Sequence, residues 1–183
     1  MKPTSPVVRP ASLLRRLGVF FAFSLLALGA ASRAHAQSQE EARATFLFNF
    51  AKFVEWPSTA FPDPATPITI AVVDDSLVAK ALERAVKGKN ANGRDIVVKN
   101  LATAEGCADS HIVYVSKTRH VEPVVQAIAG KSILSVGEDE TFLKSGGAIR
   151  LFSQDKRVKC AINTKVAESV GLKLGDKLVK VSS

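Results

Sequence analysis

Short apolar segments alternate with polar, glycine-containing segments along most of the chain. Ile68–Val73 is a continuous and mostly β-branched run, which is typical of a strand buried on both faces. Shorter runs of the same kind predict further strands, and segments that end at glycines predict helices between them. The further strands are Asp95–Leu101, His111–Ser116 and Ser132–Val136, and the helices are Leu77–Lys87 and Val121–Ala129.

The order of these elements predicts an α/β fold, a three-layer sandwich around a mostly parallel central sheet. Strands that alternate with helices of about ten residues favour parallel pairing. Ala148–Ser153 and Lys156–Ile162 flank Gln154-Asp155, so the sheet is expected to end in an antiparallel hairpin. The tail, Leu174–Val181, suits either a short helix or a strand. No repeat or linker interrupts residues 37–183, so these form one predicted domain.

Residues 1–36 carry the pattern of a secretory signal peptide. Four positive charges precede an apolar run from Leu17 to Ala31, which is shorter than the roughly 20 residues needed to cross a bilayer. Ala34-His35-Ala36 then fits the small-x-small pattern of a cleavage site. We therefore expect residues 1–36 to be cleaved and the mature chain, residues 37–183, to reach the periplasm. An uncleaved membrane anchor is the alternative.

Removal of this segment changes the charge of the protein. The whole chain has a formal net charge of +8, but its first 36 residues hold five Lys or Arg and no Asp or Glu. The mature chain is therefore close to neutral, with a net charge of +3. The basicity belongs to the export segment, which argues against a nucleic-acid-binding surface.

An aromatic helix is predicted over Glu40–Trp56, ended by Pro57. Its polar residues form one narrow stripe, and the rest of its surface is apolar, which is more than a helix covering one sheet face needs. Two interpretations stay open. The helix is buried on several sides within its own domain, or part of it meets another protein or a second copy. Under the second, the candidate interface residues are Phe46, Phe50, Phe53 and Trp56.

Few residues suggest chemistry. Asp74 and Asp75 follow the first strand and Ser116 ends the third, at the sheet edge where open α/β folds bind ligands, so these three form a candidate ligand-binding edge. Capping of the next helix explains the two aspartates more simply. The sequence holds no zinc-binding spacing, nucleophile elbow or phosphate-binding loop. We therefore predict no catalytic, metal-binding or cofactor-binding residues, and a protein that is not an enzyme.

The two cysteines, Cys107 and Cys160, both lie in the mature chain. An oxidising compartment permits a disulfide between them. The alternative is that both are free, with Cys160 a small buried hydrophobic residue inside a strand. No C-x-x-C sequence supports a thioredoxin-type role.

The segment ATFLFNFAKFVEWP at Ala44–Pro57 resembles the opening motif of the YfiR-like family of exported proteins. Weaker matches follow in order through the rest of the mature chain. They are ITIAVVDD at 68–75, GKNANGR at 88–94, HIVYVS at 111–116, ILSVGE at 133–138, GGAI at 146–149, VKCAIN at 158–163 and GLKLGDKL at 171–178.

This resemblance implies a small periplasmic α/β protein without known catalysis. The best-known relative binds the periplasmic sensor part of an inner-membrane diguanylate cyclase of the YfiN type, holds it inactive and so lowers cyclic di-GMP, which controls biofilm formation. The resemblance also implies a homodimer that is not embedded in the membrane. Cys160 stands where relatives carry a large apolar residue, so a redox switch is not transferred to this chain. A periplasmic small-molecule sensor, with its ligand near Asp74, Asp75 and Ser116, is the competing hypothesis.

The export pattern gives the first testable prediction. Protein recovered from the periplasm should begin at Gln37 and contain 147 residues, because cleavage is expected after Ala36. Amino-terminal sequencing and intact mass measure this directly. A protein that keeps its first 36 residues would instead identify the segment as an anchor.

Overall fold

The structure, a computed structural model, describes residues 39–181. Residues 39–183 group into one compact unit. The signal peptide expected at residues 1–36 lies outside the described residues.

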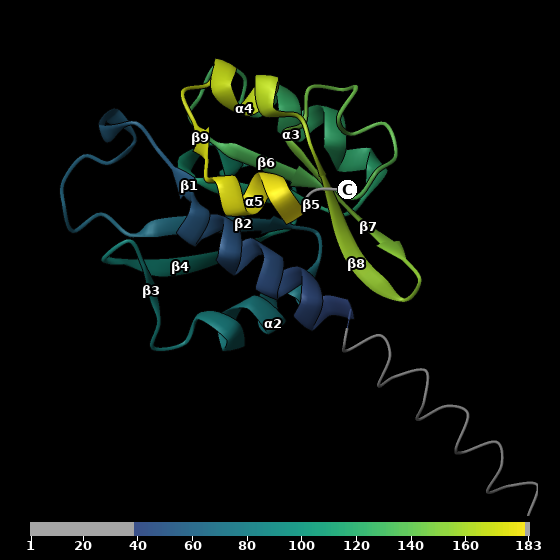
Figure 1. The fold of residues 1–183 in the computed structure, drawn as a ribbon, viewed down its shortest axis with the longest axis horizontal. Coiled ribbons are helices and arrows are strands. Elements are labelled where there is room, and N and C mark those ends of the chain that lie inside the picture. Colours follow the sequence, from purple (N-terminus) through teal and green to yellow (C-terminus); the bar gives the residue numbers. More distant parts are fainter. Residues whose placement is uncertain (1–38, 182–183) are drawn as a thin grey trace, which may run out of the picture. The chain divides into compact units, whose positions relative to one another are not determined.

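A seven-stranded sheet forms the centre of the described part (Figure 1). Its spatial order is β3-β4-β2-β5-β6-β7-β8. The strands β4, β2, β5, β6 and β7 run parallel, whereas β8 pairs antiparallel with β7, so the predicted mostly parallel sheet with a terminal hairpin is confirmed. The strands are β2 Ile68–Val73, β3 Asn90–Ala91, β4 Arg94–Leu101, β5 Ile112–Val115, β6 Leu134–Gly137, β7 Ile149–Gln154 and β8 Arg157–Ile162.

Helices cover both faces of this sheet. The N-terminal helix (residues 39–53), α2 and α5 lie on one face, and α3 lies on the other (Figure 1). The later α-helices are α2 Ser76–Val86, α3 Val121–Ala127, α4 Thr164–Ser169 and α5 Asp176–Val181. Short 3-10 turns are η1 Ser58–Ala60, η2 Cys107–Asp109 and η3 Thr118–His120. This arrangement confirms the three-layer sandwich.

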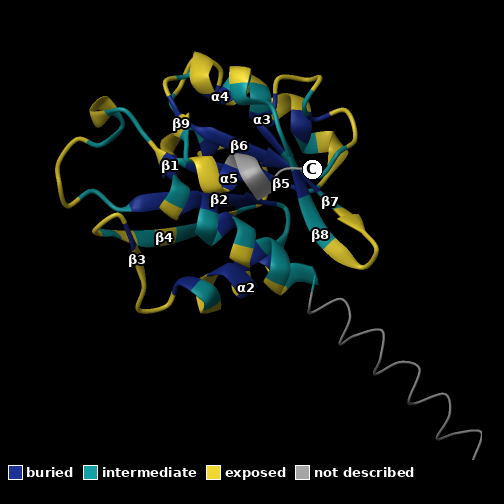
Figure 2. Cartoon of the chain, viewed as in Figure 1, coloured by how far each residue is buried: buried dark blue, intermediate teal, exposed yellow. Residues whose placement is uncertain are grey.

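Alternation along the central strands divides the apolar residues into two cores. In β2, Ile70 and Val72 face the core beneath the N-terminal helix and α2, whereas Ala71 and Val73 face the core beneath α3. Every residue of β2, β5 and β6 is buried (Figure 2). The continuous apolar runs in the sequence follow from this burial on both faces.

The aromatic helix ends three residues earlier than predicted. Residues Val54–Glu55 leave the helix as β1 and pair antiparallel with β9, Lys173–Leu174. The backbone N–H of Gly175 donates to the Phe53 carbonyl (2.9 Å), and a Cβ at Gly175 would stand 2.9 Å from that oxygen. Glycine therefore permits a close approach that local helix periodicity does not reveal.

The structure confirms that an aspartate caps the helix after the first predicted strand, and it shifts the predicted hairpin turn by one position. Asp75 caps α2 by accepting from the N–H of Val78 (3.2 Å), and Asn163 caps α4 by accepting from the N–H of Val166 (3.3 Å). The β7–β8 hairpin differs by one position, because its two turn residues with positive φ are Asp155 and Lys156. Two consecutive left-handed residues match the twist of the hairpin.

Phe142 occupies a slot between two glycines in the core beneath α3. A Cβ built on Gly137 would stand 2.5–2.7 Å from its ring, and one on Gly147 would also overlap the ring. Phe142 is fully buried, so it has no room to move aside.

We predict that Gly137→Ala lowers the free energy of unfolding by about 1–3 kcal/mol, as overpacking does. Chemical denaturation measures this. The cost of Gly137→Ala should shrink when Phe142→Leu is also present, because the two sites share one space. Gly130→Ala is the control for the coupling: a Cβ there meets nothing within 4 Å, so its cost comes from the left-handed backbone (φ 71°) and should not change when Phe142→Leu is present. Additive costs for Gly137 and Phe142 would contradict this packing.

Candidate functional site

The predicted ligand-binding edge lies at a topological switch point. The chain passes from β2 to β4 on one side and then to β5 on the other, so the sheet order reverses between β2 and β5. In open α/β sheets, ligands bind beyond the carboxyl ends of the strands at such a point. Asp74 and Asp75 directly follow β2, and Ser116 directly follows β5. The structure therefore places all three at one edge.

The two aspartates turn to different partners. Asp74 has a left-handed backbone (φ 52°), and its carboxylate pairs with Arg119 and lies 3.2 Å from His120 Nε2. Asp75 instead caps α2. In the described residues, no group of three or more His, Cys, Asp or Glu side chains is placed to hold a metal ion. Each carboxylate thus has a structural task at this edge.

Ser116 differs from the aspartates because its hydroxyl is unpaired. Its Oγ is buried and has no hydrogen-bond partner among the described residues. A buried hydroxyl without a partner is uncommon in folded proteins. It leaves one donor and one acceptor at the switch point for a water molecule or a ligand.

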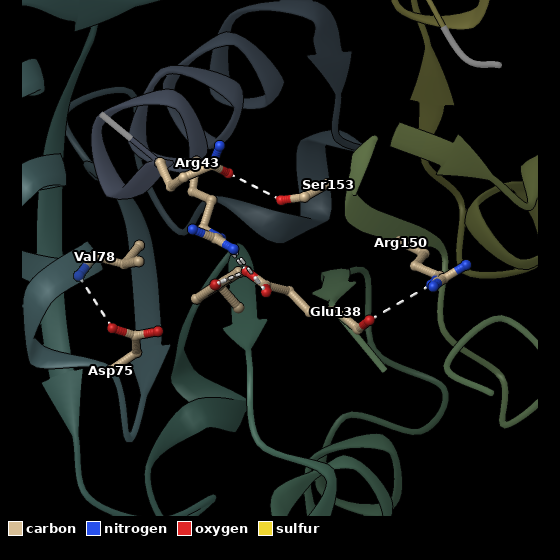
Figure 3. A network of polar contacts seen from close by, with 8 residues as sticks. Arg43, Asp75, Val78, Glu138, Arg150 and Ser153 are labelled. Carbon is tan, nitrogen blue, oxygen red and sulfur yellow. Dashed lines mark hydrogen bonds and ion pairs between the residues drawn. The ribbon is translucent and has the colours of Figure 1, made fainter. Parts of the chain in front are cut away.

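Sequence analysis missed the carboxylate at the centre of this edge, Glu138. It directly follows β6, and the Tyr114 hydroxyl and the Arg43 Nε both donate to its Oε1. Arg43 Nη2 donates to the second oxygen, Oε2, at 3.1 Å. Figure 3 shows the Arg43 side chain reaching from the N-terminal helix to Glu138, while Asp75 turns toward Val78. No motif links positions 43, 114 and 138, so only the fold brings them together.

Burial makes this network strong. The side chains of Arg43 and Glu138 are 17% and 22% exposed, and Tyr114 is fully buried. Burial, followed by the Glu138 charge, raises the pKa of Tyr114 far above its ordinary value. The phenol therefore keeps its proton and donates to a carboxylate that the guanidinium neutralises.

Asp139 ties η3 to the same edge. It accepts from the hydroxyls of Thr118 (2.7 Å) and Thr141 (2.6 Å). Hydrogen bonds from Thr141 and then Thr118 lower the pKa of Asp139 to about 2. Asp139 therefore stays ionised, and its contacts fit a role in positioning η3 rather than in proton transfer.

The four candidate interface aromatics have different environments. Phe50 is 1% exposed, so in this structure it belongs to the core. Phe46, Phe53 and Trp56 are partly buried and keep some exposed surface. Phe46, Phe50 and Phe53 also line a small hollow of about 80 Å³ with Cys160 and Leu178. Most of the helix's apolar surface therefore meets its own domain.

The considered disulfide is not formed in this structure. Cys107 and Cys160 are both free and buried. Cys107 belongs to the core beneath α3 and Cys160 to the core beneath the N-terminal helix, so the sheet separates the two thiols. Burial raises the pKa of both thiols, which keeps them protonated and poor nucleophiles.

An aromatic stack that the sequence does not predict lies at the opposite edge of the sheet, where the parallel strands begin (the amino edge). The Phe61 ring stacks on His111 (4.6 Å between centroids), and the Arg94 guanidinium lies 3.9 Å from the Phe61 centroid on the ring face. Trp56 meets both rings edge-on. Arg94 Nη1 also donates to three carbonyls of the loop at residues 63–66. Together these contacts hold residues 56–67 against the sheet.

His111 in this stack is locked in one neutral tautomer. Its Nδ1 accepts from the N–H of Thr69 (3.0 Å), so its Nε2 carries the proton and donates to the carbonyl of Ala60 (3.2 Å). Burial, with added effects of Arg94 and Lys99, lowers the pKa of His111 below its ordinary 6.5. The sequence pattern places His111 only at the start of a predicted strand.

Comparison with protein-family models gives a match over most of the chain. A family model described as DUF4154, YfiR/HmsC-like, matches residues 40–183. The search of curated proteins gives no significant match. Among the described residues, no helix has the length and hydropathy needed to span a bilayer.

The Glu138 network predicts strong coupling between the helix and the sheet edge. In a double-mutant cycle, Arg43→Met and Glu138→Gln should show a coupling free energy of about 1–3 kcal/mol, because each single change leaves a partly buried group unpaired. Urea denaturation of the four proteins measures it. The control is the exposed pair Arg84–Glu41, separated by 4.0 Å, with an expected coupling below about 0.5 kcal/mol. Equal couplings would contradict this difference.

His111 predicts a loss of stability on acidification. Because its folded pKa is lowered, the unfolded chain binds the proton first as pH falls below about 6.5, so the free energy of unfolding decreases through this range. His111→Gln should flatten the dependence between about pH 5 and 6.5, where Asp139 stays ionised in both states. Thermal unfolding across this range tests it. An unchanged slope in His111→Gln would exclude this residue as its source.

Proposed function

The chain belongs to the YfiR/HmsC-like family, and on this basis we propose that it is a non-catalytic periplasmic regulator of diguanylate cyclase signalling. In this proposal it is exported, its signal peptide is cleaved, and it binds the periplasmic sensor part of an inner-membrane cyclase. Binding holds that cyclase inactive and lowers cyclic di-GMP, and with it biofilm formation. The observation that carries the proposal is the family match over residues 40–183.

The contacts at the carboxyl edge support a binding role over a catalytic one. Asp74, Glu138 and Asp139 are each engaged by basic or hydroxyl side chains of the same chain. A general acid or base needs a proton that it can exchange near neutral pH. The hydrogen bonds that hold the pKa of Asp139 near 2 work against such a role for that residue.

Repression by binding has a simple thermodynamic requirement. A bound protein shifts its partner toward the inactive state only as far as it binds that state more tightly. A signal that releases the regulator must therefore weaken this preference. Repression of this kind requires only one binding surface on each protein and one binding equilibrium between them.

We place the partner contact at the end of the N-terminal helix. Phe53 and Trp56 keep partly exposed surface there, and we call these two residues the aromatic surface. The exposed Lys52 lies 5.8 Å from the Phe53 ring centroid. Aromatic residues are enriched in protein interfaces, and a charged residue at the rim, such as Lys52, acts mainly on specificity and association rate. The same surface could instead serve the homodimer that we expect, and the experiment below separates these uses.

A second candidate function is a small-molecule sensor, and the unpaired Ser116 hydroxyl at the switch point favours it. A ligand there would raise the unfolding temperature by mass action. Thermal-shift screening with periplasmic metabolites tests this, and Ser116→Ala should reduce any shift that arises at this edge.

The main proposal predicts capture of a specific class of partner. The immobilised protein should retain, from solubilised inner membranes of its host, a membrane protein with a periplasmic sensor and a cytoplasmic diguanylate cyclase domain. Lys52→Glu should weaken capture about tenfold through charge reversal beside the aromatic surface. Lys144→Glu, also exposed but in the turn after β6, should leave capture unchanged.

Two results would contradict the proposal. The first is a folded bait that retains no cyclase-containing membrane protein. The second is a gene deletion that leaves cyclic di-GMP at its original level. If only self-association responds to Lys52→Glu, the aromatic surface belongs to the homodimer instead.

A further inference from the structure

A hollow of about 460 Å³ opens at the amino edge of the sheet, opposite the switch point. Its floor is formed where β2, β5 and β6 begin, and residues 59–66 form one wall. This volume lies in the range of small-molecule sites. Five of its lining residues carry hydroxyl groups, namely Thr59, Thr66, Thr69, Ser110 and Ser132.

One of these hydroxyls is buried and unpaired. Ser110 is 6% exposed, and its Oγ has no hydrogen-bond partner within the described part of the chain. Buried hydroxyls are normally paired, so this group is open to a partner from outside the chain, either a water molecule or a ligand. A bound molecule in the hollow would supply one.

The wall of the hollow is already fixed in place. Arg94 Nη1 holds the carbonyls of Asp63, Pro64 and Thr66 at 3.1, 2.8 and 2.7 Å. Phe61, which belongs to this wall, stacks on His111. A ligand therefore does not have to order the loop when it binds, which favours affinity.

The charges at the rim point to a neutral ligand. Asp109 and Lys131 are both exposed and line the same hollow, so their opposite charges cancel. Lys131 Nζ uses one donor on the carbonyl of Ala108 (3.4 Å) and keeps others. Hydroxyl groups donate and accept hydrogen bonds equally well, which suits a ligand that does the same.

We propose that this hollow binds a small neutral saccharide. Sugar hydroxyls would pair with the serine and threonine hydroxyls, Ser110 Oγ would gain its missing partner, and Asp109 and Lys131 would accept from and donate to the sugar at the rim. The site uses neither the switch point nor the aromatic surface assigned to the partner.

Titration of the protein purified from the periplasm with glucose, N-acetylglucosamine and trehalose tests this, with amide chemical shifts followed by NMR. At least one saccharide should move the signals of residues 110–111 and 132–133 saturably, at concentrations up to about 50 mM. Ser110→Ala should weaken that binding about fivefold to tenfold. It should also unfold at the same or a higher temperature, because it removes an unpaired buried hydroxyl.

Ser116→Ala is the matched variant, since Ser116 Oγ is likewise buried and unpaired but lies at the other end of β5. It should leave saccharide binding unchanged. The proposal fails if none of the three sugars gives a saturable shift. It also fails if Ser116→Ala reduces binding while Ser110→Ala does not, or if inorganic phosphate moves the same signals and the sugars do not.

Discussion

The carboxylate of Glu138 accepts hydrogen bonds from Tyr114 in the centre of the sheet and from Arg43 in the N-terminal helix. It thereby joins the helix to the centre of the sheet, and Gln39 at the start of the helix adds hydrogen bonds with Ser153 and with the carbonyl of Lys156 in the hairpin. Apolar packing alone is tolerant of sliding, whereas a two-pronged contact between guanidinium and carboxylate fixes one position. This contact fixes the register of the helix on the sheet, whereas the helix ends where β1 pairs with β9.

The fixed helix determines which surfaces remain for function. Phe50 is committed to the core, so Phe46, Phe53 and Trp56 are the candidate interface aromatics that keep exposed surface. We place the partner at the end of the helix, near Phe53 and Trp56. Trp56 also touches the Phe61–His111 stack that holds the loop over the amino-edge hollow. The proposed partner surface and the proposed saccharide site are therefore mechanically connected through one tryptophan. Through these contacts, a saccharide in the hollow changes the affinity for the partner if it binds one conformation of this region more tightly than another.

Much of the fold could be read from the sequence, because β-branched runs and helix caps act locally. Ile68–Val73 and the capping residue Asp75 are clear cases. The pairing of β1 with β9 was missed because it joins segments more than 100 residues apart. The Glu138 network and the His111 stack were missed for the same reason: each depends on side chains that converge only after folding. The residue types at the switch point could be identified from the sequence. Whether their hydrogen-bond and ion-pair partners would come from the same chain could not be predicted.

Hydrogen exchange in the native protein tests most directly whether Glu138 fixes the N-terminal helix. In Glu138→Gln, the carboxylate becomes a neutral amide of the same shape. The account predicts that amides of residues 43–53 exchange faster than in the wild type, while those of β2 and β5 keep their protection. Equal loss of protection in the helix and in these strands, or no change in either, would contradict the central role given to this carboxylate.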